Sequence, residues 1–312
     1  MPAKWFKCPD GGLVGIQDCL KNRGCRMGKT RCATRPYLRL ISEERPFNGK
    51  VTPSGAGNGP LYMYLMGTRD YAIDPNGMVF AVLGTTTHAK LSVHKYTFDV
   101  IAEEPLSDDR MKGIPDVLDE DEWADDKYVL SDYKTWGSYK CAKALGLEKV
   151  EEKILGEDGK PVYLKSGKNK GKPKTRKVII HNPEIIDLRD EEYQLNRYRI
   201  FFEQYGFPVS SINIQATPRD GSTYIATGRG IEKNLYIIPI KRLPDSEVLD
   251  FYSNLQAELS EAIATREMRL CNEHECWEGR RCADYCAVAH ICETEYDRPA
   301  WWEGKFIGRE AA

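Results

Sequence analysis

Two acidic residues and a lysine form the group in this chain whose types and spacing could support chemistry. Asp116 follows a Gly-Ile-Pro turn, and Asp132 and Lys134 lie two residues apart in the strand-like run at residues 128–136. Side chains alternate between the faces of a strand, so Asp132 and Lys134 are expected to point the same way. If the acidic spacer lets the chain fold back, Asp116 joins them. Two carboxylates can then hold a hard divalent cation, Mg²⁺ or Mn²⁺, with an ammonium group beside it.

The elements that must position this group are three strands and a preceding helix. Segments 97–106, 111–120 and 128–136 are predicted to be successive strands of one sheet, joined by short acidic turns. Segment 78–98 has apolar residues at helical spacing, with His88 at its centre. A lone histidine is more often structural than a ligand, but the position of His88 just before the acidic group favours a functional role.

The downstream half adds the clearest helix of the chain at residues 187–205, on which Gln194 and Tyr198 are four apart and share a face. Segments 210–221 and 233–243 are predicted to be strands. Two further helices are predicted at residues 138–152 and 245–268, the second with Asp245 or Ser246 as its N-cap.

Composition sets limits on the kind of protein. The chain has 312 residues, a hydrophobic content of 41%, a charged content of 29% and a formal net charge of −2. No apolar run approaches the length of a membrane span, and the first residues lack the apolar centre of a signal peptide, so a cytoplasmic protein without a membrane partner is expected. Nucleic-acid binding would need a local basic surface, because the bulk charge is not basic.

One segment offers such a surface. A hairpin insertion is predicted at about residues 150–180, and its tip, residues 165–177, is a run of Lys and Arg interrupted by Gly and Pro. Two interpretations remain open. The tip is either a solvated loop or a flexible basic finger that lies over a phosphate backbone.

Nine of the ten cysteines lie in two clusters at the chain ends. The remaining one is Cys141, and the clusters are Cys8, Cys19, Cys25 and Cys32, then Cys271, Cys276, Cys282, Cys286 and Cys292. Clustered cysteines in an intracellular chain indicate metal binding before disulfides. We therefore divide the chain into a cysteine-rich arm (1–36), a core (37–265) and a cysteine-rich tail region (266–312).

The ordered set His88, Asp116, Asp132-Tyr133-Lys134 and Gln194-x-x-x-Tyr198, bracketed by cysteines, resembles the RecB-like branch of the PD-(D/E)xK nucleases. It is most similar to the iron–sulfur members, namely the CRISPR-associated RecB-like exonucleases and the AddB-type nuclease domains. The resemblance spans about residues 32–292 by motif order. It implies an α/β fold with a PD-(D/E)xK restriction-endonuclease-like core, in which helices flank a mixed central sheet and both chain ends form a metal-cluster region.

The resemblance also implies roles for single residues. His88, Asp116 and Asp132 would bind Mg²⁺ or Mn²⁺, and Lys134 would position the attacking water and offset charge in the transition state. Gln194 and Tyr198 would orient the substrate and the lysine. The implied activity is metal-dependent hydrolysis of DNA, as an exonuclease on single strands or DNA ends, with protein partners in a DNA-processing complex.

The resemblance implies one cysteine near the N-terminus and three near the C-terminus as ligands of a 4Fe–4S cluster. Cys32 and the triplet Cys282, Cys286 and Cys292 fit this set, although three residues separate Cys282 from Cys286 where the family usually has two. The assignment could therefore shift to include Cys276. The surplus cysteines could build a second, zinc site from Cys8, Cys19 and Cys25 with Cys271 or Cys276; the alternative is that they are free thiols.

Two other classes of function remain open at this point. One is a non-catalytic nucleic-acid-binding or assembly module that uses the nuclease fold as a scaffold. The other is a zinc-stapled DNA-binding protein in which the Asp-x-Lys pair has no catalytic role.

Overall fold

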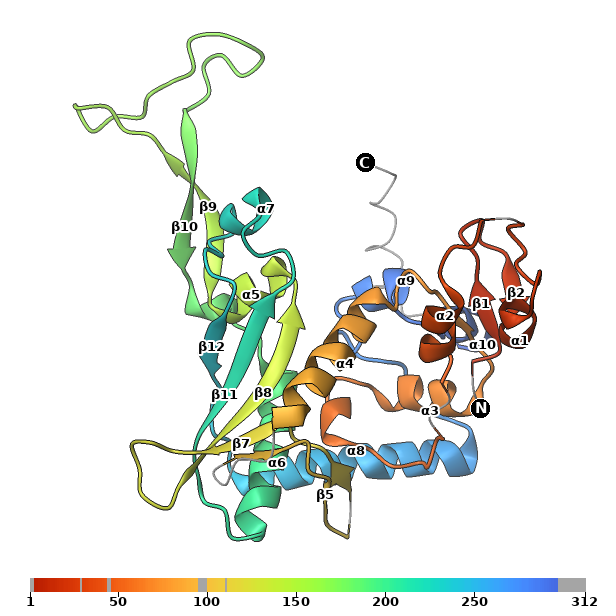
Figure 1. The fold of residues 1–312 in the computed structure, drawn as a ribbon. Helices are drawn as coiled ribbons and strands as arrows, with labels where there is room; N and C mark the ends of the chain where they lie inside the picture. The colour runs from red at the N-terminus through yellow and green to blue at the C-terminus, as the bar shows by residue number, and fades with distance from the viewer. Residues whose placement is uncertain (1–2, 29, 44–45, 95–99, 110, 297–312) are drawn as a thin grey trace.

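A five-stranded mixed β-sheet forms the centre of the molecule (Figure 1). The computed structural model describes residues 3–28, 30–43, 46–94, 100–109 and 111–296. The strand order is β12-β11-β8-β7-β4, with bounds Tyr236–Pro239, Val209–Pro218, Tyr128–Trp136, Val117–Glu120 and Val100–Ala102. Pairing is antiparallel except between β8 and β11, which run parallel. The chain therefore has a mixed α/β fold, and all five predicted strands are confirmed; residues 97–99 of the first predicted segment lie outside the described residues.

The sheet opens next to the acidic group. The pairing of β7 with β8 ends at Val117 opposite Ser131, whereas the pairing of β8 with β11 continues to Trp136 opposite Pro218. Among the described strands, the second half of β8 therefore pairs with β11 alone. This opening leaves the β7 side of Asp132 and Tyr133 accessible to side chains from other segments.

Helices cover both faces of the sheet. The helix α6 (Arg189–Gln204) packs on β8 and β11 and reaches the face that carries Asp132 and Lys134. The helix α4 (Val79–Leu91) lies on the face of Tyr133, whose ring centroid is 6.1 Å from that of His88. The predicted helices at 78–98 and 187–205 are thus confirmed over most of their length, with His88 one turn from the end of α4; residues 95–98 lie outside the described residues.

The long helix α8 (Asp245–Thr265) packs on α6 and on α3 (Pro60–Thr68) (Figure 1). Its buried residues recur at helical spacing and form one apolar stripe: Val248, Tyr252, Leu255, Leu259 and Ala262. The prediction of its N-cap was wrong by at least one residue. The N-cap is Pro244, which leaves Asp245 in the first turn, where its charge favours the positive end of the helix dipole.

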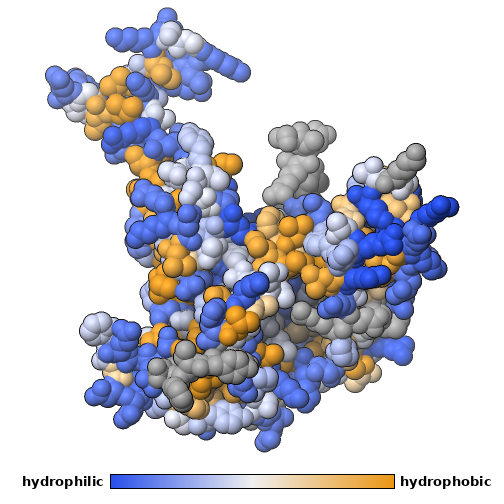
Figure 2. Space-filling view, viewed as in Figure 1, coloured by the Kyte–Doolittle hydropathy of each residue, from blue (hydrophilic) through white to orange (hydrophobic). Residues whose placement is uncertain are grey.

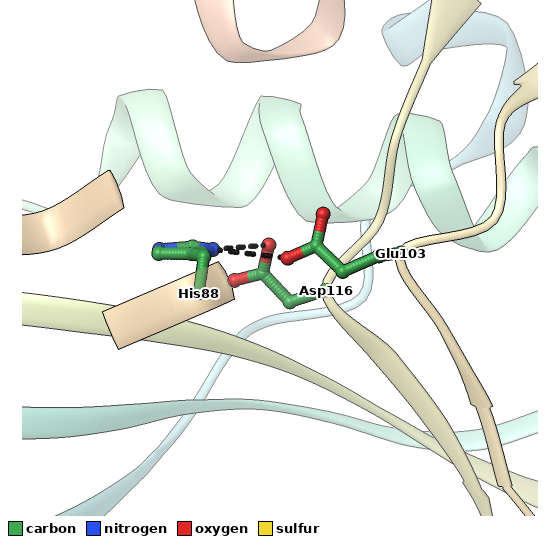
Figure 3. Close-up of side chains that lie close together, drawn as sticks. All are labelled: His88, Glu103 and Asp116. Atoms are coloured by element: carbon green, nitrogen blue, oxygen red, sulfur yellow. Dashed lines mark ion pairs between the residues drawn. The ribbon is translucent and has the colours of Figure 1, made fainter. Parts of the chain in front are cut away.

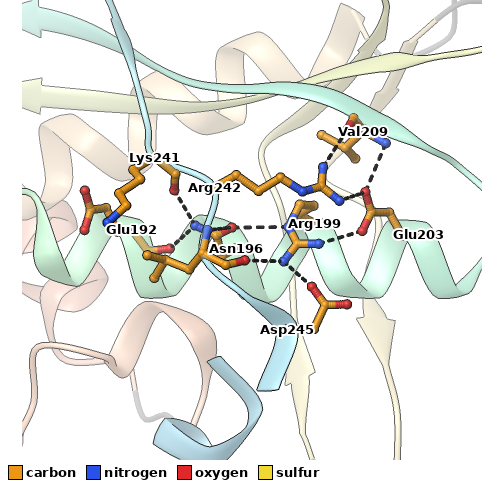
Figure 4. A network of polar contacts seen from close by, with 9 residues as sticks. Glu192, Asn196, Arg199, Glu203, Val209, Lys241, Arg242 and Asp245 are labelled. Atoms are coloured by element: carbon orange, nitrogen blue, oxygen red, sulfur yellow. Dashed lines mark hydrogen bonds and ion pairs between the residues drawn. The ribbon is translucent and has the colours of Figure 1, made fainter. Parts of the chain in front are cut away.

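A network of buried polar groups fixes α6 to the segment that leads into α8 (Figure 4). The Arg199 guanidinium is fully buried and donates to Glu203, Asp245 and the Leu243 carbonyl at 2.6, 2.6 and 3.1 Å. Asn196 accepts from the Leu243 amide at 3.0 Å and donates to the Lys241 carbonyl at 2.8 Å. These bonds satisfy buried donors and acceptors and set the position of α6 along the sheet.

The predicted helix at 138–152 is wrong in its second half. The helix α5 (Ser138–Ala144) ends before Gly146, which has a φ of 66°, and β9 (Leu147–Lys153) begins directly afterwards. Glycine adopts this left-handed conformation without steric cost, so the chain turns there. The strand β9 pairs antiparallel with β10 (Thr175–His181), which confirms the predicted hairpin.

The N-terminal cysteines belong to a small module. A three-stranded sheet in the order β2-β1-β3 is built from Leu13–Gly15, Trp5–Lys7 and Ala72–Ile73. The helices α1 (Ile16–Leu20) and α2 (Arg35–Ile41) cover it. Its small core consists of Phe6, Ile16, Cys19, Leu38, Ile41 and Ile73. Such a core is small for an independent unit.

The remaining elements are short. They are η1 (Pro53–Gly55), η2 (Ser92–His94), β5 (Leu106–Ser107), β6 (Lys112–Gly113), η3 (Pro183–Ile185), α7 (Tyr224–Thr227), α9 (Arg280–Asp284) and α10 (Ala289–Glu295). Among the described residues, no helix combines the length and the apolar character that crossing a membrane requires.

Candidate active site

Three potential metal ligands from three segments converge at the opening of the sheet (Figure 3). His88 Nδ1 lies 3.0 Å from Asp116 Oδ1 and 3.4 Å from Glu103 Oε1. One ligand atom from each residue lies within 4.8 Å of the other two. We call His88, Glu103 and Asp116 the ligand triad. Within the described part of the chain, no other three His, Cys, Asp or Glu residues meet this distance.

Asp116 is held by the backbone of β8. Its Oδ2 accepts a hydrogen bond from the Tyr133 amide at 2.6 Å, where the pairing of β7 with β8 has already ended. The carboxylate thus replaces the missing strand partner. This hydrogen bond holds Asp116 beside the strand that carries Asp132, a proximity that the sequence alone could not establish.

Glu103 is the member of the triad that sequence reasoning missed. It follows β4 directly, and its amide donates to the Asp116 carbonyl at 3.1 Å. Its φ is 53°, in the left-handed region that costs a non-glycine residue conformational energy. This backbone conformation accompanies a carboxylate that is turned toward His88 and Asp116. The available signal in the sequence was an acidic pair, Glu103 and Glu104, at the end of the predicted strand that precedes the Asp116 strand.

Asp132, Lys134 and Gln194 form a second polar group beside the triad. Lys134 Nζ lies 2.6 Å from Asp132 Oδ2 and donates to Gln194 Oε1 at 3.2 Å, and Gln194 Nε2 donates to Asp132 Oδ1 at 3.2 Å. The side chains of Asp132 and Lys134 therefore lie on one face of β8, as alternation predicts. Asp132 does not belong to the compact triad; its carboxylate holds the lysine.

The charges of this second group depend on burial. Burial raises the pKa of Asp132 to about 6, and the Lys134 ammonium opposes this shift. For Lys134, burial acts to lower the pKa, but the Asp132 carboxylate outweighs it and keeps the pKa above its ordinary value. The lysine therefore remains a cation at neutral pH, as a group that offsets phosphate charge must.

A proton on His88 balances the triad in the absence of a metal ion. The hydrogen bond to Asp116 raises the pKa of His88 to about 9, while burial opposes this shift. Two carboxylates at this distance repel each other unless a positive charge lies with them. An imidazolium supplies that charge in the metal-free protein, and a divalent cation would replace the proton.

Tyr198 lies deeper, behind Gln194. It is 3% exposed, and burial raises its pKa well above the ordinary range of tyrosine, so the phenol stays neutral. A hydrogen bond to Gln194 links the two residues, which share a helix face as predicted. The ring also explains the glycine of the Gly-Ile-Pro turn, because a Cβ added at Gly113 would lie 2.6 Å from Tyr198 Cε1.

The cysteines separate into the same two groups as in the sequence. Cys32 has Cys8 and Cys19 as electrostatic neighbours, and Cys19 also has Cys25. In the tail region, Cys282 hydrogen bonds to Cys276 and neighbours Cys271 and Cys286, and Cys271 neighbours Cys292. All ten cysteines are free, and no three thiols are as close together as the triad atoms.

A large cleft of about 1530 Å³ runs between the N-terminal module, α4 and the tail-region cysteines. Its walls include Lys7, Thr85, Ala89, Cys282 and Cys286. The triad residues do not line it. The helix α4 therefore separates the cleft from the ligand triad, with Thr85 and Ala89 on the cleft side and His88 on the triad side.

Comparison with known proteins adds little to this geometry. No protein-family model matches the chain, and no curated protein matches it in sequence. A crystal structure of SSO0001 aligns over 84% of this chain and 93% of its own length, with 14% identity and a TM-score of 0.37. A similarity at that TM-score carries no argument. The case for a function therefore rests on the residues themselves.

Proposed function

We propose that this chain is a divalent-metal-dependent DNA nuclease with a RecB-like PD-(D/E)xK core, which hydrolyses phosphodiester bonds in single strands or at DNA ends. The observation that carries the proposal is the convergence of His88, Glu103 and Asp116 within 4.8 Å beside the lysine of an Asp-x-Lys strand. The order of the sheet also supports it. Three antiparallel strands, β4, β7 and β8, are followed by α6 and then by β11, parallel to β8.

The donor set of the triad fits the metal. Carboxylate oxygens suit both Mg²⁺ and Mn²⁺, and one imidazole is compatible with a transition metal such as Mn²⁺. His88, Glu103 and Asp116 would hold the ion. When bound, it lowers the pKa of a water molecule and neutralises charge on phosphate oxygens. The charges of Asp116 and His88 both affect the pKa of Asp132, so Asp132 lies near the triad. Its carboxylate therefore adds negative potential at the metal site even without binding the ion directly.

The remaining residues act on the substrate through Lys134. Its ammonium is held between Asp132 and Gln194, so its position is set before a substrate arrives. A preorganised cation at this place stabilises charge that builds on a phosphate oxygen in the transition state. Gln194 holds both Asp132 and Lys134, and the neutral Tyr198 supports Gln194 from behind.

The test is cleavage of end-labelled single- and double-stranded DNA with Mg²⁺, Mn²⁺ or chelator. We expect metal-dependent cleavage that falls at least about a thousandfold in Asp132→Ala and in Lys134→Ala, since each removes transition-state stabilisation. Lys143→Ala is the matched control, because Lys143 pairs with Asp187 outside the site at 3.1 Å. Retained activity in either folded site variant would overturn the assignment, and binding without cleavage by the unmodified chain would favour a non-catalytic module.

The metal content of the cysteines forms a separate part of the proposal. The resemblance implies Cys32 with Cys282, Cys286 and Cys292 as 4Fe–4S ligands, whereas the neighbours seen here favour a tail-region set that includes Cys276 and Cys282. Cys32 would then complete a zinc site with Cys8, Cys19 and Cys25. Anaerobic purification with iron and zinc analysis separates these sets. If Cys32→Ser loses zinc and keeps the visible iron–sulfur absorption, the tail-region set holds; if it loses iron, the set from the resemblance holds.

A further inference from the structure

A basic arm projects from the body of the molecule (Figure 1). It consists of the β9–β10 hairpin and the residues between the two strands, and it attaches to the body beside α5 and α7. Residues 159–177 contain eight Lys or Arg residues and no Asp or Glu, in a chain whose net charge is −2. Charge of this density at one exposed tip is what a local basic surface for nucleic acid requires.

The arm divides into two loops with different charge. Backbone hydrogen bonds join Val162 to Ile154 and Lys174 to Val162, so the chain folds back within the arm. One loop contains Glu157 and Asp158. The other, which we call the basic loop, spans residues 164–174 and is closed by hydrogen bonds between Leu164 and Lys172 at 2.9 Å and between Gly171 and Leu164 at 2.9 Å.

The basic loop carries five lysines, all of them exposed to solvent: Lys165, Lys168, Lys170, Lys172 and Lys174. Across the described residues, none of them forms an ion pair, whereas Arg176 at the base of the loop pairs with Glu152 at 2.8 Å. Hydrophilic residues predominate at the tip on the face shown in Figure 2, with a few hydrophobic ones among them. Five unpaired cations concentrated on one loop repel each other, so a polyanion that neutralises them would bind favourably.

We propose that the basic loop binds the phosphate backbone of double-stranded DNA next to the segment that the triad cleaves. This proposal rests on the proposed function for the identity of the ligand. A two-stranded β-ribbon has the cross-section that the major groove of DNA admits. From His181 to Lys172 the extended chain runs roughly 30 Å at about 3.3 Å per residue, which corresponds to about nine base-pair steps at 3.4 Å. The arm is therefore long enough to follow about that length of duplex.

The experiment measures binding separately from cleavage. Both variants are made in an Asp132→Ala background, without divalent metal, and the dissociation constant is measured by fluorescence anisotropy between 50 and 300 mM salt. The test variant replaces the five lysines by glutamine, and the control replaces the same five by arginine, which keeps the charge. The ligands are a 30-base-pair duplex and a 30-nucleotide single strand.

Each lysine that contacts a duplex phosphate contributes about 0.9 to the slope of log K against log salt, and about 0.7 on a single strand. We expect the glutamine variant to lose at least about two units of slope and about tenfold in affinity for the duplex, while the arginine variant keeps both. An unchanged slope overturns the proposal. A loss confined to the single strand also overturns it, since the loop then serves another ligand.

Cleavage of short and long substrates keeps this test independent of the proposed function. These assays use chains with intact Asp132. The glutamine variant should cleave a 10-nucleotide single strand as fast as the protein with the unmodified loop does. On long substrates that have duplex beside the end, it should be less active. If DNA binding depends on the basic loop but no variant cleaves DNA, the nuclease assignment is wrong and the proposal that the loop binds DNA is retained. If the glutamine variant cleaves every substrate as fast as the unmodified protein, the proposal for the basic loop is wrong and the nuclease assignment is retained.

Discussion

The helix α6 has two polar faces that differ in how their charged groups are neutralised. On one face, Arg199 is enclosed by Asn196, Glu203, Asp245 and the Leu243 carbonyl, so its donors are matched by acceptors (Figure 4). On the other, Gln194 donates to Asp132 and accepts from Lys134, beside two carboxylates that both approach His88 Nδ1 (Figure 3). The first arrangement is complete within the chain. The second balances its charges only with a proton or a cation from solution.

This difference separates a structural network from a functional site. A buried guanidinium that is fully hydrogen bonded contributes to a specific position of α6, and removing it leaves a cavity and a buried carbonyl without a donor. A cluster of like charges with one movable proton costs stability and gains affinity for a cation. The two regions should therefore respond oppositely to mutation.

The largest effect is expected in the structural network. Arg199→Ala should lower the free energy of unfolding by about 3–5 kcal/mol, because it removes a large, fully buried side chain and leaves the buried Leu243 carbonyl without its donor. The cleavage rate of the molecules that remain folded should stay unchanged. Urea denaturation measures the first quantity and single-turnover cleavage the second. Arg176→Ala, which breaks the exposed pair with Glu152, is the control and should cost less than about 1 kcal/mol.

An intermediate effect is expected from pH, through His88. Its folded pKa of about 9 exceeds the ordinary 6.5 because of the hydrogen bond to Asp116, so the protonated form stabilises the metal-free fold. That contribution is complete below pH 6.5 and is lost as the pH rises toward 9. A metal ligand must be neutral, so Mn²⁺ affinity should rise about tenfold per pH unit over the same window. Mn²⁺ titrations of His88→Gln should lose this slope, while His181→Gln at the base of the hairpin keeps it.

The smallest effect is expected at Glu103, where two substitutions distinguish the contribution of the backbone conformation from that of the carboxylate charge. Glu103→Gly relieves a left-handed φ of 53° and should raise the free energy of unfolding by up to about 1 kcal/mol. Glu103→Gln keeps the backbone and removes only the charge. Both variants should bind Mn²⁺ more weakly, but only the glycine variant should gain stability from the backbone. Equal Mn²⁺ affinity in the glutamine variant and the unmodified chain would remove Glu103 from the triad.

The amino-acid sequence by itself determined the relations that depend on local periodicity. Alternation along a strand placed Asp132 and Lys134 on one face, and the helical repeat placed Gln194 and Tyr198 together. Strand and helix patterns identified the five strands of the central sheet and the helices α6 and α8. Gly146 was the local signal that the prediction of a continuous helix at 138–152 overlooked, since a glycine there ends α5 and starts a strand.

Only the tertiary structure decided the relations between distant segments. The end of the β7–β8 pairing at Val117 opposite Ser131 lets Asp116 bind the Tyr133 amide, and the pairing of β4 with β7 brings Glu103 beside it. The packing of α4 on β8 then adds His88. Such contacts depend on strand register and on packing between segments many residues apart, and residue spacing along the chain does not encode either. For the same reason the sequence found nine clustered cysteines, whereas the fold decided that Cys32 neighbours Cys8 and Cys19.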